Sequence, residues 1–155
     1  MLSKRALPIA DDDTAETLFN KLAPLGAELL VETLPKYISG EITSQLQPEE
    51  DATYAKMLKK ADGELDFSKT AVELERQTRA FSPWPSSFFE WEGKRVKGPR
   101  AKVDGRKSPG IGSKLKVAGA PAIGTSEGIL ILVQIQPAGK KRMDGKSFLA
   151  GGRDW

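Results

Sequence analysis

Apolar residues recur at helical spacing near the start of the chain. Asp13 precedes this run, with Glu16 three residues later, a pattern typical of a helix N-cap and its capping box. Ser39-Gly40 predicts the end of the helix. The spacings of four, three and four residues place one set of leucines on a single helical face. These are Leu18, Leu22, Leu25 and Leu29.

Two prolines fall inside this helical pattern. Pro24 and Pro35 each remove an amide donor, so we expect them to kink or divide the helix. Residues 2–9, before the helix, have the pattern of a strand. A strand and one helix do not make a domain, so this segment must pack on the rest of the chain or on a part that is missing.

Residues 41–66 show no sustained hydrophobic period and predict an extended linker, with a turn at Asp62-Gly63. By pattern alone, this is an ordinary surface connection. A second helix is predicted from Ser68, its N-cap, to the stop at Pro83. We expect Ala71, Leu74, Thr78 and Phe81 on its buried side.

Short segments of β pattern follow the second helix. Turn signals at Gly93-Lys94, Pro109-Gly110, Ala118 to Pro121 and Ser126 to Gly128 separate them. Strands at this spacing favour a small antiparallel barrel or sandwich. A short helix from Asp144 to Leu149 is expected last. The expected strands are Ser87 to Glu92, Arg95 to Lys97, Ser113 to Val117, Ala122-Ile123 and Gly128 to Ile135.

Charge is distributed unevenly along the chain. Residues 1–91 hold 10 Lys and Arg against 16 Asp and Glu, a net of −6, whereas residues 92–155 hold 14 against 5, a net of +9. The two halves sum to the net charge of +3. A half this basic is typical of a surface that faces a polyanion. The alternative is a solvated basic face with no partner.

Composition excludes several kinds of chemistry. The chain contains no cysteine and no histidine, so disulfides, thiol nucleophiles, imidazole bases and thiolate or His-ligated metal sites are ruled out. No glycine-rich phosphate loop follows a strand. No apolar run approaches the length of about 18 residues that a membrane span needs. No long apolar segment follows the basic residues in Met1 to Arg5, so no signal peptide is predicted. A cytoplasmic protein is the simplest expectation.

Three consecutive cations follow the most apolar predicted strand. Lys140, Lys141 and Arg142 would lie at a barrel rim, where small barrels place ligand-binding loops. Phosphate contacts from such residues are independent of sequence and sensitive to salt. A patch that only aids solubility is the alternative.

Four aromatic residues and two acidic runs allow other interpretations. The aromatics could stack on unpaired bases, but we expect them in the core: Trp84, Phe88, Phe89 and Trp91. The acidic runs, Asp11 to Asp13 and Glu49 to Asp51, could form acid–base pairs or metal ligands. Their adjacent spacing favours helix capping and linker solvation, so no metal site is predicted.

Several motifs together resemble the C-terminal half of bacterial methionyl-tRNA formyltransferases, across nearly the whole chain. The Pro-Trp-Pro segment is shared with formyltransferases that act on other substrates, whereas the Gln-Pro-x-Gly-Lys-Lys-x-Met segment is more specific. The motifs are Asp13-Thr14-Ala15-x-Thr17-Leu18, Leu25 to Leu30, Ala52-Thr53-Tyr54-Ala55, Arg79-Ala80-Phe81-x-Pro83-Trp84-Pro85 and Ile135-Gln136-Pro137-x-Gly139-Lys140-Lys141-Arg142-Met143, with Phe148-Leu149 behind the last.

The resemblance implies a two-domain enzyme. A Rossmann-like N-terminal domain binds 10-formyltetrahydrofolate and an OB-like C-terminal domain helps to hold initiator tRNA, whose methionine is formylated. The family's catalytic Asn, His and Asp belong to the N-terminal domain. The Asp stands directly before the Met-Leu pair that Met1-Leu2 matches. We therefore expect an inactive chain with no catalytic residue and no bound cofactor.

The resemblance also implies a fold class and a division of the chain. The class is α+β, with residues 1–40 as the closing strand and helix of the formyl-donor domain, 41–66 as linker and 67–155 as the OB-like tRNA-binding domain. We expect a monomer whose partners are initiator methionyl-tRNA and the missing catalytic domain. One departure from the family pattern, Lys97-Gly98-Pro99-Arg100, predicts a shortened or bent second strand.

Six cations are the candidate tRNA contacts: Lys94, Lys97, Lys102, Lys140, Lys141 and Arg142. Two other functions remain open. One is a stand-alone basic binding module, and the other is a related formyltransferase that acts on a different amine, such as that of a nucleotide sugar. The lysines and methionine of the last motif argue against the nucleotide sugar.

Overall fold

A computed structural model describes residues 1–151 and 155, with every side chain among them except that of Pro99. The chain forms two compact units, Met1–Met57 and Leu58–Trp155. The second unit begins before the predicted end of the linker, because Leu65 is buried in its core. The division into 1–40, 41–66 and 67–155, and the origin of each part, stays a prediction.

The first unit is built around one helix, α1 (Ala15–Ile38). Its N-cap is Thr14, whose hydroxyl accepts from the Thr17 backbone N–H while the Thr17 hydroxyl accepts from the Thr14 N–H. The predicted cap at Asp13 with Glu16 is therefore wrong by one residue. Asp13 instead accepts from the Thr17 hydroxyl and from Lys21, whose Nζ lies 2.6 Å away. Hydrogen bonds from Lys21, the Ala10 amide and Thr17 lower the pKa of Asp13 to about 2.

The two prolines do not divide α1, which continues through both and ends at the cap Ser39, followed by Gly40 at φ 78°. Each proline removes one amide donor from the helix. The predicted strand at 2–9 is also wrong, since residues 1–10 form no strand. A strand exists only through pairing, and no other strand lies in this unit. The segment is tied to α1 by Arg5, 2.6 Å from Glu32.

Helix α1 leaves a broad apolar face uncovered within its own unit. Thr33 is its one buried residue. The large apolar side chains that stay exposed recur at helical spacing, which marks a face suited to packing. They are Phe19, Leu22, Leu30, Val31, Leu34, Tyr37 and Ile38.

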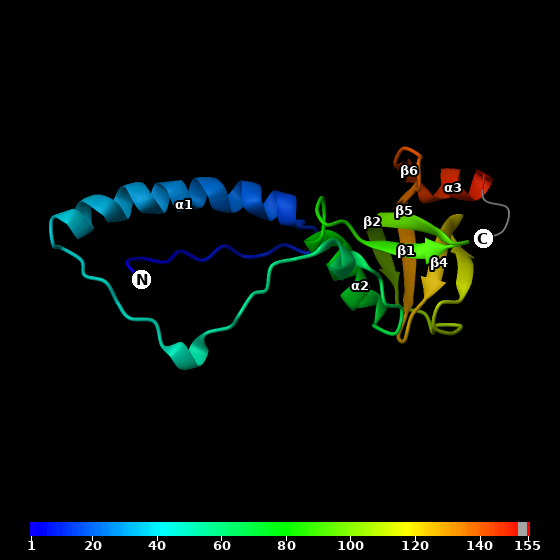
Figure 1. Cartoon of the computed structure of the whole chain (residues 1–155), viewed down its shortest axis with the longest axis horizontal. Coiled ribbons are helices and arrows are strands. Elements are labelled where there is room, and N and C mark those ends of the chain that lie inside the picture. Colours follow the sequence, from blue (N-terminus) through cyan, green and yellow to red (C-terminus); the bar gives the residue numbers. More distant parts are fainter. Residues whose placement is uncertain (152–154) are drawn as a thin grey trace. The chain divides into compact units, whose positions relative to one another are not determined.

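The remaining elements follow in chain order (Figure 1). The 3₁₀ turn η1 (Glu49–Asp51) belongs to the first unit, and the predicted linker is otherwise free of α-helix and strand. The second unit contains η2 (Lys60–Gly63), α2 (Ala71–Ala80), β1 (Phe88–Trp91), β2 (Lys94–Asp104), β3 (Lys114–Val117), β4 (Ala120–Gly124), β5 (Ile129–Pro137), β6 (Met143–Asp144) and α3 (Gly145–Gly151).

The six strands form one antiparallel sheet in the order β1-β2-β5-β4-β3, with β6 also paired to β5. Strand β5 is central because its continuous apolar run can be buried between neighbours. Its Gln136 lies opposite Lys97 of β2, and its Leu130 lies opposite Ile123 of β4. The α+β class is confirmed. The OB-like topology stays a prediction.

Helix α2 covers part of the sheet with the face that the sequence predicts. Ala71, Leu74 and Thr78 are fully buried. Removing a leucine side chain from water contributes about 1.5–3 kcal/mol. The N-cap is Thr70, not Ser68; the Ser68 hydroxyl donates to Asp66 instead. The final helix α3 starts at Gly145, within a residue of its expected position.

Strand β2 is longer than predicted and irregular where the departure from the family pattern lies. It continues through Gly98-Pro99 to Asp104, so the segment does not end the strand. Its register against β5 shifts between Lys97 and Arg100 and again between Arg100 and Ala101. Proline has no amide donor for the ladder, which accounts for a bulge at this place.

The core confirms most of the aromatic prediction. Phe88 and Phe89 are buried, and Trp91 packs against the core. Its ring centroid lies 5.1 Å from that of Phe148 and 5.8 Å from that of Trp155. Trp84 contradicts the prediction, because 53% of it is exposed. No helix among the described residues is long and apolar enough to cross a membrane.

Candidate nucleic-acid interface

The predicted cations of two distant segments meet at one end of the sheet. Antiparallel pairing sets Val96 of β2 opposite Pro137 of β5. The loop from Ala138 to Arg142 leaves β5 at this point and returns as β6. The start of β2 therefore lies beside the loop that carries Lys140, Lys141 and Arg142, as the rim prediction requires.

A tight turn fixes the beginning of this loop. Gly139 has φ 72°, a conformation that favours glycine. The Lys140 amide donates to the Pro137 carbonyl at 3.1 Å, and the Gln136 side-chain amide donates to the Lys140 carbonyl at 3.1 Å. These two bonds anchor the backbone from which Lys140 projects.

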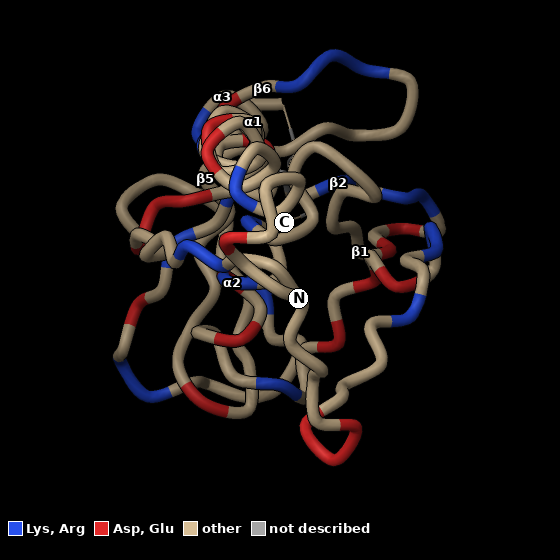
Figure 2. The backbone as a smooth tube through the Cα atoms, turned by 90° about the vertical axis from the view of Figure 1, so that its left-hand side faces the viewer, with Lys and Arg blue, Asp and Glu red and all other residues tan. Residues whose placement is uncertain are grey.

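Five of the six predicted contacts lie at this end of the sheet, and one does not. Strand alternation puts Lys94 on the same face of β2 as Val96, and Lys97 on the opposite face. Lys102 lies further along β2, opposite Ile131, roughly 15 Å from Lys97 at the usual rise per strand residue. Sequence reasoning missed Arg95, although strand alternation puts it on the same side of β2 as Lys97. Figure 2 shows Lys and Arg positions on the backbone near β2 and β6. We call the following six residues the basic patch: Lys94, Arg95, Lys97, Lys140, Lys141 and Arg142.

The patch is largely free to meet an external anion. Arg95 has an internal partner: its Nε lies 3.4 Å from Glu90, and its guanidinium lies 3.9 Å from the centre of the Phe88 ring. Among the described residues, none of the other five has an ion pair within 4 Å. All six side chains are exposed. Cations that are neither paired nor buried give a surface of positive potential.

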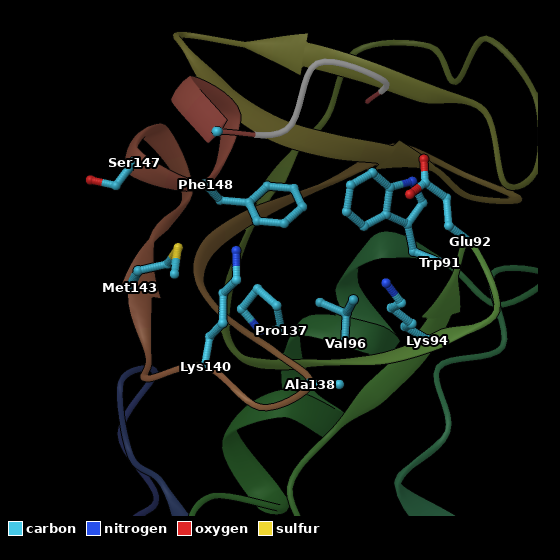
Figure 3. Close-up of a pocket in the computed structure, with 11 residues that line it drawn as sticks. Trp91, Glu92, Lys94, Val96, Pro137, Ala138, Lys140, Met143, Ser147 and Phe148 are labelled. Atoms are coloured by element: carbon cyan, nitrogen blue, oxygen red, sulfur yellow. The ribbon is translucent and has the colours of Figure 1, made fainter.

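A pocket of about 360 Å³ opens beside the patch (Figure 3). Its floor is made by Val96 and Phe148, both buried, and Trp91 and Pro137 stand at its sides. Lys94 and Lys140 extend their ammonium groups toward the aromatic rings from opposite sides (Figure 3). The remaining lining residues are Glu92, Ala138, Met143, Ser147 and Gly151.

Helix α3 closes one side of this pocket and is held in place by Asp144. The Asp144 carboxylate accepts from the Ser147 backbone N–H at 2.8 Å and from its hydroxyl at 2.7 Å. These hydrogen bonds lower the pKa of Asp144, so the carboxylate is ionised at neutral pH. Gly145 lets the helix approach closely, since a Cβ there would lie 2.2 Å from the Leu132 carbonyl oxygen.

Among the described residues, no cluster of three or more acidic side chains could hold a metal ion. The chemistry that this end of the sheet offers is anion binding through ammonium and guanidinium groups, next to an aromatic cavity. The motifs found in the sequence supply Pro137, Lys140, Met143 and Phe148 to that cavity.

Comparison with known proteins shows the family of the chain. Residues 57–153 match the family of formyl transferase C-terminal domains, and the chain belongs to that family. The particular relatives carry a more specific name. A methionyl-tRNA formyltransferase of Myxococcus xanthus (strain DK1622) is 42% identical over 153 residues, covering 97% of this chain and 48% of the relative. A methionyl-tRNA formyltransferase of Streptococcus pneumoniae (strain Hungary19A-6) is 41% identical over 156 residues, covering 97% of this chain and 49% of the relative.

The chain thus spans about half the length of the curated relatives it matches, and corresponds to their C-terminal half. The resemblance deduced from the motifs is confirmed. Two solved structures share the fold at 17% identity. A variant of HypX from Aquifex aeolicus has a TM-score of 0.68 over 96% of this chain and 28% of that one. WlaRD, a sugar 3N-formyl transferase, has a TM-score of 0.61 over 90% of this chain and 50% of that one. Another HypX structure contains tetrahydrofolic acid.

Proposed function

We propose that this chain is the tRNA-holding half of a methionyl-tRNA formyltransferase. The complete enzyme would transfer a formyl group from 10-formyltetrahydrofolate to the amino group of methionine on initiator tRNA. The observation that carries the proposal is the exposed basic patch in a chain 42% identical to a methionyl-tRNA formyltransferase.

The patch would act by electrostatic positioning. Ammonium and guanidinium groups bind backbone phosphates regardless of base sequence, and they fix the orientation of the nucleic acid. Lys102, the outlying predicted contact, would reach a phosphate elsewhere on the same RNA. The patch would therefore orient the tRNA, and bond formation is left to another domain.

Catalysis and folate binding belong to that other domain in this proposal. The chain holds no histidine, so it lacks one of the catalytic groups that the family resemblance implies. The exposed apolar face of α1 supports the same division of labour, because such a face gains stability when a sheet covers it. Residues 1–40 would complete the formyl-donor domain, residues 67–155 would form the OB-like tRNA-binding domain, and the protein would be a cytoplasmic monomer.

A salt titration of tRNA binding tests the proposal. If about five phosphates are neutralised, raising salt from 50 to 200 mM weakens binding roughly 500-fold with the slope known for duplex DNA. Filter binding of initiator methionyl-tRNA to the full chain measures this change. Affinity that stays flat across the range refutes the electrostatic role.

Two control measurements separate the competing functions. A nucleotide sugar serves as the competing ligand, and tighter binding of it than of tRNA would favour a sugar formyltransferase. Formylation assays with the chain, 10-formyltetrahydrofolate and methionyl-tRNA should yield no product. Product formed by the chain alone would contradict the division of labour.

A further inference from the structure

The pocket beside the basic patch has features that phosphate positioning alone does not use. We propose that it holds a single unpaired nucleotide, with the base against Trp91 and Phe148 and its phosphate between Lys94 and Lys140. This inference rests on the proposed function, because it names a feature of the RNA that the domain would recognise.

The size and lining of the pocket support this ligand. Its volume of about 360 Å³ lies within the usual range for small-ligand sites, about 300–1,000 Å³. Such a cavity admits one nucleotide and excludes a duplex. Its walls combine two aromatic rings with the apolar ring of Pro137 and the thioether of Met143 (Figure 3). Bases stack on aromatic side chains whatever their identity, because every base has a π face.

The charges at the pocket fit a nucleotide better than a neutral apolar ligand. Lys94 and Lys140 point their ammonium groups inward from opposite sides (Figure 3), and neither has an ion pair within the described residues. A phosphate between them would receive two charge-assisted hydrogen bonds. Glu92 also lines the pocket, and its carboxylate can accept from the amino group of adenine, cytosine or guanine.

The walls are rigid enough to form a site before the ligand arrives. Phe148 is 5% exposed and Val96 is 1% exposed, so the floor is part of the core. The Trp91 ring is held by Phe148 and Trp155, and Lys114 Nζ lies 5.6 Å from its centre. The turn at Gly139 fixes the backbone of Lys140. A cavity prepared in this way loses little entropy on binding.

The first test follows tryptophan indole N–H signals by NMR while adenosine monophosphate is added to the full chain. We expect a saturable shift of the Trp91 signal. Trp84 is the internal control, because its exposure of 53% makes it the site where unspecific stacking would show. Adenosine should bind at least fivefold more weakly, and inorganic phosphate should leave Trp91 unchanged. Equal, unsaturable shifts of Trp84 and Trp91 would overturn the inference.

A matched pair of variants separates the pocket from the patch. Lys140→Ala removes a pocket cation, whereas Lys141→Ala removes a neighbouring exposed cation that does not line the pocket. We expect Lys140→Ala to weaken adenosine monophosphate binding at least fivefold and Lys141→Ala to change it less than twofold. Equal losses would mean that general charge, not the pocket, binds the nucleotide.

RNA hairpins with and without one unpaired nucleotide distinguish a nucleotide in RNA from a free one. We expect the unpaired nucleotide to raise affinity roughly 5- to 150-fold, the usual gain from one stacked base. Ala138→Trp, which places a large ring at the pocket, should abolish that gain and leave the salt dependence intact. If neither hairpin displaces adenosine monophosphate, the site serves free nucleotides and the RNA assignment is wrong. If salt-dependent tRNA binding persists without any preference for the unpaired nucleotide, the pocket inference fails while the proposed function stands.

Discussion

Neutralising the three consecutive cations of the basic patch gives a quantitative test of phosphate positioning. The triple variant Lys140→Ala, Lys141→Ala, Arg142→Ala changes exposed side chains in the loop between β5 and β6. The hydrogen bonds that fix this loop use backbone atoms and Gln136, so the turn should survive. We therefore expect a folded protein with an altered electrostatic surface.

The magnitude follows from counting phosphate contacts. With about five contacts the logarithm of the binding constant falls by about 4.5 per decade of salt, and with about two it falls by about 1.8. Between 50 and 200 mM salt, the original chain should lose affinity roughly 500-fold and the triple variant roughly 12-fold. Filter binding of initiator methionyl-tRNA at four or five salt concentrations gives both slopes.

A matched triple variant controls for total charge. Lys59→Ala, Lys60→Ala and Lys69→Ala remove three exposed cations of the same unit outside the patch. Their slope should stay near that of the original chain. Equal slopes for the two triple variants would refute the reasoning, because binding would then depend on net charge and not on the patch.

Three further variants or titrations test the fold. Gly145→Ala should destabilise the second unit by about 1–3 kcal/mol in urea unfolding, because the added Cβ would meet a backbone oxygen. The control variant Gly105→Ala, with no atom within 4 Å of its Cβ, should have little effect, and equal stabilities of the two variants would contradict the close approach of α3. Thr70→Ala should cost about 1 kcal/mol through loss of the α2 N-cap, and an unchanged urea midpoint would argue against that cap. By NMR, the pKa of Asp13 should be about 2, below its ordinary value of 3.8. The contribution of this carboxylate to stability is therefore complete above pH 3.8 and is lost as the pH falls toward 2. A titration midpoint at 3.8 would show that its hydrogen bonds are absent in solution.

Local patterns in the sequence predicted much of the second unit. The helical spacing of Ala71 and Leu74 identified the buried face of α2. The apolar run before Pro137 predicted a strand, which the structure places at the centre of the sheet as β5. The loop cations follow the end of β5, as the sequence predicts, because glycine and charged residues end the apolar run of the strand; their role as tRNA contacts stays a prediction. Each of these signals depends on residues close together in the sequence.

Features that depend on tertiary contacts were missed. Trp84 has a large apolar side chain of the kind usually found in a core, yet it is exposed in the structure. The segment at 2–9 has the pattern of a strand, but its own unit, residues 1–57, contains no strand to pair with. The pocket joins Trp91 to Phe148, which are more than fifty residues apart, so no local periodicity could reveal it. Arg95 could have been found, because it lies two residues before Lys97 in a predicted strand and so shares its face.

Hydrogen–deuterium exchange of the full chain with and without initiator methionyl-tRNA tests the central claim most directly. We predict protection at residues 94–97 and 138–143, which hold the basic patch, and none at β3, whose Lys114 and Lys116 are equally basic but lie on another strand. Protection confined to β3 or to the first unit would contradict the claim that this end of the sheet holds the RNA.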